Sequence, residues 1–200
     1  MMLRSAPPSP FGRKVKMAAK ILDLTDRIEV VSADLNDPDD SIRQQNPLGK
    51  IPALVLDDGT CLYDSRVICE HLDGLAGGGR LFPSSEARMP AIRLQALADG
   101  LMDAGILQVY EARYRPEEKR HQPWLDRQRE KVERTLAALE ADPPAFDGTP
   151  DIGHVTLACA LGYLDFRFDG KWRESHPRLV AWLDAFAAAV PAYGETAPHD

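Results

Sequence analysis

The first half of the chain alternates between short runs of strand character and short segments of helical spacing. Residues 2–6 predict a short strand, which Pro7 and Pro8 end. The period then changes to that of an amphipathic helix over about residues 11–23, entered through Pro10. The apolar positions of this predicted helix are Val15, Ala18, Ala19 and Leu22.

The pattern then returns to strands. The stretch RIEVVSADL, residues 27–35, is rich in β-branched residues and predicts a second strand. DDSIRQQN, residues 39–46, predicts one or two helical turns, and residues 47–63 predict two short strands around an Asp-Gly turn. A short helix over 65–72 follows. The order β-α-β-α-β-β-α therefore predicts a compact α/β layer within about 75 residues.

In the second half the strand signals vanish and helical spacing takes over. Apolar positions predict helices over about 86–114 and 122–141, a third from near Asp151 and a fourth after Pro177. The glycine-rich stretch DGLAGGGRLFP between the halves predicts a flexible connection and a domain boundary. The expected domains are an α/β domain at 1–76 and an all-helical domain at 86–200.

Composition narrows the class of protein. Apolar residues make up 44% and charged residues 28% of the chain, as in ordinary globular proteins. The net charge of −7 and the lack of a basic run argue against nucleic acid as a partner. No signal peptide or run of about eighteen apolar residues is visible, so we expect no membrane partner and a cytoplasmic location. The three cysteines have no spacing suited to zinc or to a disulfide framework, so we expect no metal.

Two contiguous motifs and the order of the elements resemble one known family. SPFGRKV (residues 9–15) stands where the first strand gives way to a helix, and NPLGKIPALVLDDGTCLYDSRVICEHLD covers residues 46–73. With the helical second half, these motifs are similar to bacterial, serine-type members of the cytosolic glutathione S-transferase family. The resemblance implies a thioredoxin-like βαβαββα domain that binds glutathione and an all-helical C-terminal domain that supplies the second-substrate pocket. It also implies a homodimer through the third and fourth helices.

Ser9 is the candidate catalytic residue. The thiol of glutathione, with a pKa of about 8.5 to 9, must ionise to attack an electrophile at neutral pH. A hydroxyl hydrogen bond and the positive end of a helix both favour the thiolate. The resemblance assigns these roles to Ser9 and the helix behind it, with Phe11 beside the sulfur; an ordinary helix N-cap is the alternative interpretation of the serine. Arg13 and Lys14 in the first helical turn indicate an anionic neighbour, although two solvated cations would look the same in sequence.

The motifs GKIPAL and YDSRVI carry the predicted glutathione-binding residues. The resemblance implies a cis bond before Pro52, so that the main chain of Ile51 pairs with the cysteine part of glutathione like a neighbouring strand. Lys50 matches the residue that meets the glycine carboxylate, with an exposed loop lysine as the alternative. Ser65 would hydrogen-bond the γ-glutamyl carboxylate at the start of a helix, and Asp64 would face the γ-glutamyl ammonium. A plain helix cap is the alternative for both.

The first helix of the helical domain should border the open side of the glutathione site. Met102, Ile106 and Tyr110 are the residues expected in the second-substrate pocket, although helical stripes of this kind are core more often than pocket. Asp99 and Asp103, four residues apart, are expected on a solvated face, with contact to glutathione of a neighbouring subunit as the alternative. Further pocket candidates are Leu101, Gly105, Val109, Tyr114 and Trp172.

Other chemically active residues are assigned structural roles. Asp151 is expected to cap the core helix of the second domain, and His154, three residues on, is interpreted as structural. Cys61 and Cys69 are expected in the core. A hydroxyl at position 9 cannot carry out the disulfide exchange of cysteine-type relatives, so disulfide reductase and dehydroascorbate-type activities are disfavoured.

We therefore expect an enzyme that conjugates the thiolate of glutathione, held at Ser9, to small apolar electrophiles. Glutathione is the co-substrate, no metal is required, and detoxification is the role that the family resemblance implies. Two alternatives share the fold. One is a non-catalytic glutathione transferase-like module that binds a partner or carries a ligand, and the other is a glutathione-dependent isomerase or dehalogenase, which differs only in the second pocket.

Overall fold

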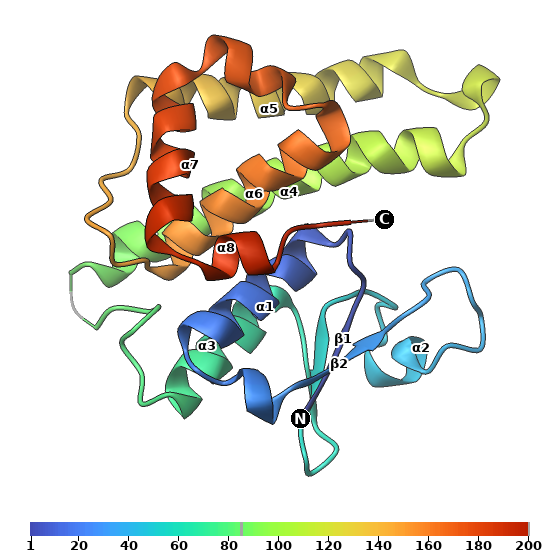
Figure 1. The fold of residues 1–200 in the computed structure, drawn as a ribbon. Helices are drawn as coiled ribbons and strands as arrows, with labels where there is room; N and C mark the ends of the chain where they lie inside the picture. Colours follow the sequence, from blue (N-terminus) through green and yellow to red (C-terminus); the bar gives the residue numbers. More distant parts are fainter. Residues whose placement is uncertain (85, 200) are drawn as a thin grey trace.

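A computed structural model describes residues 1–84 and 86–199. The chain folds into a small β-sheet domain and a larger helical domain stacked on it (Figure 1). The mixed sheet has the order β2-β1-β3-β4, in which β1 runs parallel to β2 and antiparallel to β3. Its strands are β1 (Met2–Ser5), β2 (Glu29–Ser32), β3 (Ala53–Val55) and β4 (Cys61–Leu62).

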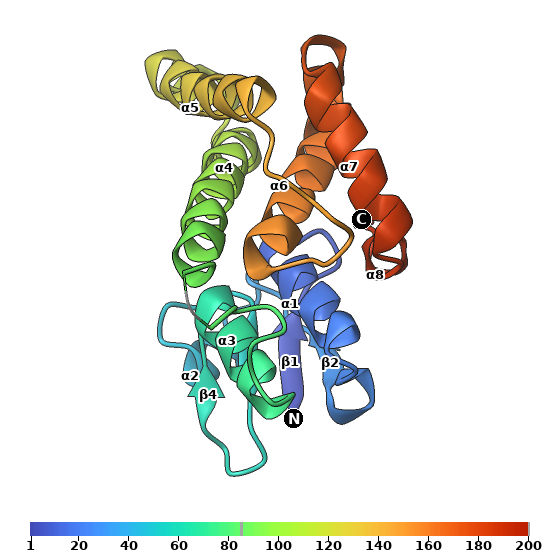
Figure 2. The ribbon, with the colours of Figure 1, turned by 90° about the vertical axis from the view of Figure 1, so that its left-hand side faces the viewer.

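Three helices cover the sheet. α1 (Pro10–Ile21) and α3 (Ser65–Leu75) lie side by side on one face, and the short α2 (Ile42–Gln45) lies on the other (Figures 1 and 2). Leu3 and Leu54, paired across β1 and β3, are fully buried in the core. The predicted order βαβαββα is confirmed.

The helical domain is built around α6 (Ile152–Phe168), most of whose residues are buried. Where α4 (Arg88–Tyr114) packs along it, a Cβ atom on Gly153 would lie 2.7 Å from the carbonyl oxygen of Ala91, so only glycine fits this crossing. No helix in the described residues combines the length and apolarity needed to cross a membrane. The remaining helices are α4 (Arg88–Tyr114), α5 (Gln122–Ala141), α7 (Pro177–Ala189) and α8 (Ala192–Glu195), with 3-10 turns at Thr25–Arg27, Glu117–Lys119 and Lys171–Ser175.

The predicted long helices correspond to α4, α5, α6 and α7, with closely similar bounds. The short α8 was not predicted. It returns the C-terminal segment to the first domain, where it packs against α1 (Figure 2). The segment between α3 and α4 joins the two domains, and their exact limits at 76 and 86 stay a prediction.

The two domains share one hydrophobic core, in which α1 packs against α6. Arg13 contributes to this packing, because its Nη2 donates a 2.8 Å hydrogen bond to the carbonyl oxygen of Tyr193. Its guanidinium also lies 4.3 Å from the centroid of the Tyr193 ring. Arg13 therefore meets a carbonyl group and a ring, and the prediction that its neighbour is anionic is wrong.

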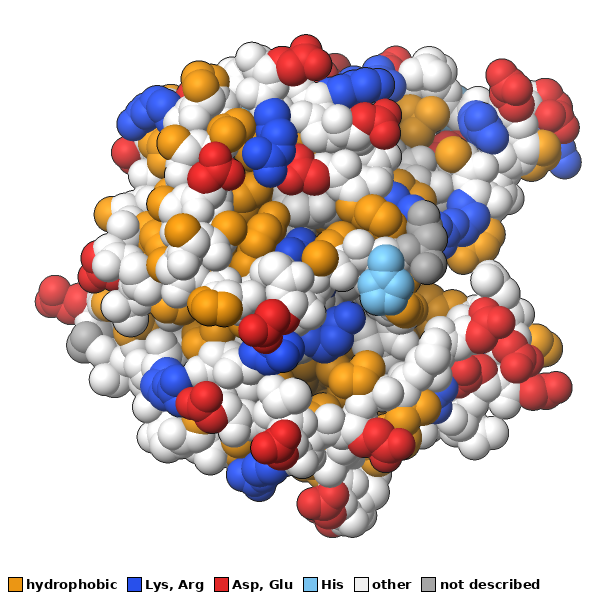
Figure 3. Space-filling view, in the orientation of Figure 1, with side chains coloured by type: hydrophobic (Ala, Val, Ile, Leu, Met, Phe, Trp, Pro, Cys, Tyr) orange, Lys and Arg blue, Asp and Glu red, His pale blue; other side chains and the backbone are white. Residues whose placement is uncertain are grey.

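Acidic side chains gather on the loop between β2 and α2. Figure 3 shows these acidic groups at the lower right, with the surface hollowed between them and the helical domain. Across this hollow, the Tyr114 hydroxyl donates a 3.4 Å hydrogen bond to Oδ1 of Asn36. Arg4 pairs with Asp40 at 2.7 Å and so ties the loop to β1. The acidic residues of the loop are Asp34, Asp37, Asp39 and Asp40.

Candidate functional site

Two adjoining cavities lie where the sheet domain meets the helical domain. The larger has a volume of about 580 Å³ and the smaller about 420 Å³. They share four lining residues, and therefore form one continuous site. Ser9 lines the larger cavity, and every residue predicted to bind glutathione lines the smaller one. The shared residues are Phe11, Lys50, Ile51 and Asp103.

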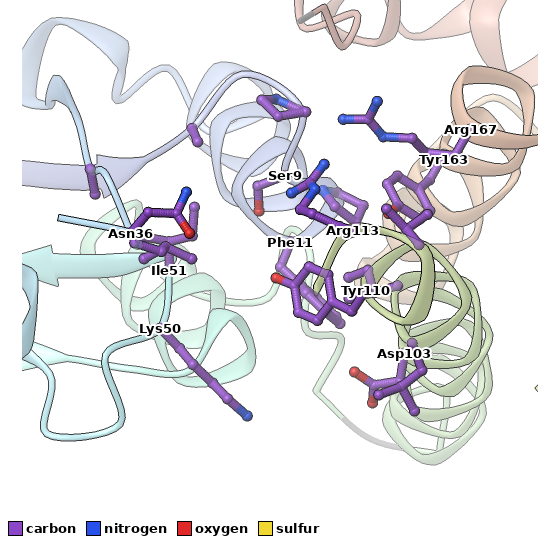
Figure 4. A pocket seen from close by; sticks show the side chains of 18 of the residues that line it. Ser9, Phe11, Asn36, Lys50, Ile51, Asp103, Tyr110, Arg113, Tyr163 and Arg167 are labelled. Atoms are coloured by element: carbon purple, nitrogen blue, oxygen red, sulfur yellow. The ribbon is translucent and has the colours of Figure 1, made fainter. Parts of the chain in front are cut away.

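Ser9 stands at the wall of the larger cavity and at the N-cap of α1 (Figure 4). Its Oγ accepts a 3.0 Å hydrogen bond from the main-chain N–H of Gly12, so the capping role is real. Accepting this bond leaves the hydroxyl proton available to a group in the cavity. The first turn of α1 contains no acidic residue, so no carboxylate there offsets the positive end of the helix dipole. Ser9 can therefore both cap its helix and donate to an anion.

The loop before β3 lines both cavities. The Ile51–Pro52 peptide bond is cis, as predicted. The buried Asn46 holds this loop, because its Nδ2 donates to the carbonyl oxygen of Lys50 at 2.8 Å and its Oδ1 accepts from the N–H of Leu48 at 3.0 Å. The exposed Lys50 side chain borders both cavities, where its ammonium can meet a carboxylate. The structural role of Asn46 was not predicted.

Asp64 and Ser65 stand at the beginning of α3 and line the smaller cavity. Oδ1 of Asp64 accepts a 2.9 Å hydrogen bond from the N–H of Arg66, so Asp64 is a helix cap. A carboxylate has further acceptor sites for an ammonium group. Ser65 is buried and opens the helix, whose first-turn N–H groups favour an anion. The two interpretations of this motif, cap and binding group, are compatible.

Asp99 is buried, and the expectation of a solvated face is wrong for it. Its side chain is 2% exposed, with Oδ1 at 2.6 Å from Nζ of Lys14 and Oδ2 at 2.6 Å from Nε of Arg66. Lys14, fully buried, comes from α1, and Arg66 comes from α3. This ion-pair cluster ties the helical domain to both helices of the sheet domain. It also supplies the anionic neighbour that the position of Lys14 indicated.

Asp103, one turn further along α4, borders both cavities and keeps an exposed side chain. Partial burial and the negative charge of Asp99 raise the pKa of Asp103, while Lys50 and Arg66 oppose the shift. Of the two aspartates, only Asp103 thus agrees with the expected exposure. Its position places a carboxylate at the junction of the cavities.

α4 supplies one wall of the larger cavity. Of the residues expected in the second-substrate pocket, Ile106 and Tyr110 line it, together with Val109 and Tyr114. Met102 does not, because it is 1% exposed and belongs to the hydrophobic core. Residues four apart advance by about 40° around a helix, so the stripe from Tyr110 back to Met102 turns away from the cavity. Leu101 and Trp172, further candidates, are also core residues.

The larger cavity also contains polar side chains of the helical domain that were not predicted, among them Arg113 on α4, and Tyr163 and Arg167 on α6 (Figure 4). Burial raises the pKa of Tyr163 to about 12, against the opposing charge of Arg167, so the phenol stays protonated at neutral pH. Arg113 follows Tyr110 by three residues, a spacing that could have identified it. Tyr163 and Arg167 lie on a largely apolar helix, and only the packing of α6 beside α4 brings them to the cavity.

His154 has a structural role, as predicted. Its Nδ1 accepts a 3.1 Å hydrogen bond from the N–H of Asp151, and Oδ1 of Asp151 accepts a 3.0 Å bond from the N–H of His154. This reciprocal pair is a capping box at the start of α6. Across the described residues, His, Cys, Asp and Glu side chains form no group of three suited to a metal ion.

The cysteines lie outside both cavities. Burial raises the pKa of Cys69 to about 12 and that of Cys159 to about 11. Cys61 is half-buried against a small apolar cluster, and burial raises its thiol pKa as well. The prediction that Cys69 is a core residue is confirmed. All three thiols are therefore poor nucleophiles at neutral pH.

Comparison with known proteins gives the family. Residues 8–75 match the N-terminal domain of glutathione S-transferases, and residues 122–185 match the glutathione S-transferase C-terminal domain. The GST-like protein YibF of Escherichia coli (strain K12), described as uncharacterized, is 35% identical over 189 residues. This match covers 92% of each chain.

Solved structures agree over the whole chain. A glutathione transferase family member from Pseudomonas fluorescens Pf-5, with bound glutathione, is 42% identical with a TM-score of 0.88, covering 100% of this chain and 99% of that one. A further structure from this organism contains bound S-(propanoic acid)-glutathione, at 42% identity, a TM-score of 0.86 and full coverage of both chains. A glutathione S-transferase from Methylobacillus flagellatus KT, with glutathione bound, is 33% identical with a TM-score of 0.89 and 99% coverage of both chains. The chain belongs to the glutathione S-transferase family.

Proposed function

We propose that this protein conjugates the thiolate of glutathione to small electrophiles. The observation that carries the proposal is the position of Ser9, whose hydroxyl caps α1 at the wall of the larger cavity. Glutathione occupies the smaller cavity, with its glycine carboxylate near Lys50 and its cysteine part paired with the main chain of Ile51. Its γ-glutamyl end meets Asp64 and Ser65.

The charges of the smaller cavity suit this ligand. Glutathione carries two carboxylates and one ammonium group at neutral pH. Lys50 and the helix N-terminus at Ser65 complement the carboxylates, and Asp64 complements the ammonium. The relatives from Pseudomonas fluorescens and Methylobacillus flagellatus contain bound glutathione, which supports the same ligand here.

Held in this way, glutathione directs its sulfur toward the residues that the two cavities share. A hydrogen bond from Ser9 and the positive end of α1 favour ionised sulfur over protonated sulfur. Each unit of pKa depression corresponds to about 1.4 kcal/mol. The sulfur lone pair then forms a bond to the electrophilic carbon, and the leaving group departs with its bonding electrons. Phe11, at the junction, covers the sulfur.

Serine variants test this proposal with two measurements: glutathione-dependent ultraviolet absorbance of the thiolate, and conjugation of a general aryl halide. Ser9→Ala and Ser9→Gly both remove the hydroxyl, but glycine still caps a helix at a cost of only a few tenths of a kcal/mol. Both variants should lose thiolate absorbance at pH 7 and about 10- to 100-fold in kcat, with a smaller change in glutathione affinity. Ser5→Ala is the matched control, since the Ser5 hydroxyl is buried outside both cavities and has no hydrogen-bond partner among the described residues.

The outcomes separate the candidate functions. Thiolate formation at the unchanged level in Ser9→Gly would show that another group lowers the thiol pKa. Glutathione binding by the native chain without thiolate formation would favour a non-catalytic binding module. A glutathione-dependent isomerase or dehalogenase would form the thiolate and turn over a different substrate, which a substrate panel detects.

We further propose that the enzyme acts in detoxification as a cytoplasmic homodimer, as the family resemblance implies. Large apolar side chains remain exposed on the single chain, and a second copy would cover part of them. Light scattering should give twice the chain mass of 22.1 kDa. A monomer mass at micromolar concentration would exclude a stable dimer. Examples of these exposed side chains are Leu48, Val67 and Met89.

A further inference from the structure

We propose that the electrophile accepted in the larger cavity carries a carboxylate, and that Arg113 binds this group. The inference rests on the proposed function, because it names the substrate class of the same site. Arg113 is then a specificity-determining residue.

The wall opposite the sheet domain combines apolar and cationic groups. Arg113 on α4 and Arg167 on α6 both line the cavity that Ser9 lines from α1. Figure 4 shows their guanidinium groups extending toward the side of the cavity on which Ser9 lies. Ile106 and Val109 add apolar surface to the same wall. A short carbon chain that ends in an anion would meet both kinds of surface.

The Arg113 guanidinium is accessible to such a ligand. It lies 6.0 Å from the centroid of the Tyr110 ring. In the part of the chain that the structure describes, no carboxylate forms an ion pair with it, whereas Arg66 of the smaller cavity is paired with Asp99. The planar guanidinium can donate two parallel hydrogen bonds to one carboxylate, a geometry that lysine cannot offer.

The groups around Arg113 reinforce this preference. Arg167 lines the same wall, where its guanidinium lies 4.1 Å from the Phe166 ring centroid and interacts with the Tyr163 hydroxyl. Burial raises the pKa of both Tyr110 and Tyr163, so these phenols stay neutral and add no negative charge to the wall. They remain hydrogen-bond donors to an anion.

The two acidic residues that line the larger cavity, Asp34 and Asp103, form no ion pair with Arg113 in the described residues. Asp103 stands at the junction with the smaller cavity, where the charges of Lys50 and Arg66 act on it. Asp34 lies on the loop after β2, and its Oδ1 accepts a 2.9 Å hydrogen bond from the N–H of Asn36. The carboxylates of glutathione itself are matched in the smaller cavity. An anion beside Arg113 therefore belongs to the electrophile.

Binding of matched glutathione thioethers tests the inference without catalysis. S-(2-carboxyethyl)glutathione carries the acid, its carboxamide analogue is the neutral isostere, and S-methylglutathione reports on the glutathione half alone. By calorimetry on the full chain, the acid should bind about 10- to 100-fold more tightly than the amide. In Arg113→Gln this ratio should fall by about fivefold or more, with the phenol donors leaving a small remaining preference. Both ligands carry the same glutathione half, so any effect of the substitution on binding of that half cancels from the ratio of the two affinities.

Arg93→Gln is the matched control. It removes the same charge from an exposed position of α4, outside both cavities and about 30 Å along the helix, and should keep the preference for the acid. Equal binding of acid and amide to the native chain, or an undiminished preference for the acid in Arg113→Gln, overturns the inference. If S-methylglutathione binds in these cases, the proposed function survives. If none of the three thioethers binds, the proposed function and the inference both fail.

Discussion

Replacing Asp99 by asparagine should destabilise the protein by about 3 kcal/mol, because the change leaves a buried ammonium group without a counter-charge. Lys14 is fully buried, and its Nζ lies 2.6 Å from Oδ1 of Asp99. Removing one partner of such a pair costs about 3 to 5 kcal/mol. Asparagine keeps an oxygen that can accept a hydrogen bond from Lys14, which places the expected loss at the lower end. Arg66, with 51% of its side chain exposed, can exchange its lost partner for water.

Thermal and urea unfolding of the chain without glutathione measure this loss. A chain of this length loses about 2–4 °C in Tm per kcal/mol, so Asp99→Asn should lower Tm by about 6–12 °C. The ligand is omitted because binding to the folded state adds its own stabilisation. A loss of this size is a large fraction of the 5–15 kcal/mol that is typical of folded proteins at about 25 °C.

Two further variants provide a control and a test of recovery. Asp126→Asn is the control, since Asp126 forms a 2.9 Å pair with Arg129 on α5 in which both side chains are about half exposed; such a pair contributes about 1 kcal/mol or less. Replacing both buried partners, Lys14→Met with Asp99→Leu, should recover much of the loss because no charge is left in the core. If Asp99→Asn and Asp126→Asn have the same Tm, the buried pair contributes no more than a surface pair and the reasoning is refuted.

Ser65→Ala should weaken glutathione binding about 10- to 100-fold, because a lost hydrogen bond to a charged group costs roughly 1.5 to 3 kcal/mol. Calorimetry measures this, with the exposed Ser84→Ala as the control, and an unchanged affinity would remove Ser65 from the binding site. Because burial raises the pKa of Cys69 to about 12 and of Cys159 to about 11, iodoacetamide should alkylate neither thiol in the folded protein at pH 8. Raising the pH to about 9.5 should accelerate labelling of Cys61 alone. Mass spectrometry should find three labels after denaturation, whereas a label on Cys69 or Cys159 of the folded chain would contradict their burial.

The sequence predicts the part of the site that is built from contiguous residues. The start of α3 at Ser65 follows from residue types within a few positions, and the cis bond before Pro52 from the family resemblance of the short motif GKIPAL. The order of strands and helices likewise follows from changes in the apolar period along the chain. These features are local, so they can be identified before the fold is known.

The burial of Asp99 could not be predicted from local sequence patterns. Asp99 and Asp103 are the same residue type, four apart on one helix, and no local pattern separates them. Asp99 is nevertheless buried against a lysine 85 positions earlier in the chain, whereas Asp103 keeps an exposed side chain at the junction of the two cavities. The packing of the two domains decides which acid is buried, because it places the distant cation.

The prediction of the second-substrate pocket on α4 is partly wrong for a related reason. A helical stripe predicts which residues share a face, but it does not give the angle at which that face meets the other domain. On α4 the cavity begins only after Met102 has turned into the core, and it continues as far as Arg113 and Tyr114. The expected stripe was therefore about one turn too early, and it missed the cation at its far end.

Three helix caps show why the role of a capping residue cannot be assigned from one domain alone. Ser9, Asp64 and Asp151 stand at the N-caps of α1, α3 and α6, so their sequence signal is the same. Capping uses only an oxygen lone pair, which leaves a proton on Ser9 and a second oxygen on Asp64 for a ligand. Asp151 is capped in turn by His154 and lies outside the two site cavities. Asp151 and His154 line a different cavity, so the position of a cap relative to the two domains distinguishes these three residues, and α4 and α6 supply the wall opposite Ser9. The proposed use of Ser9 in catalysis therefore depends on the helical domain as much as on its own helix.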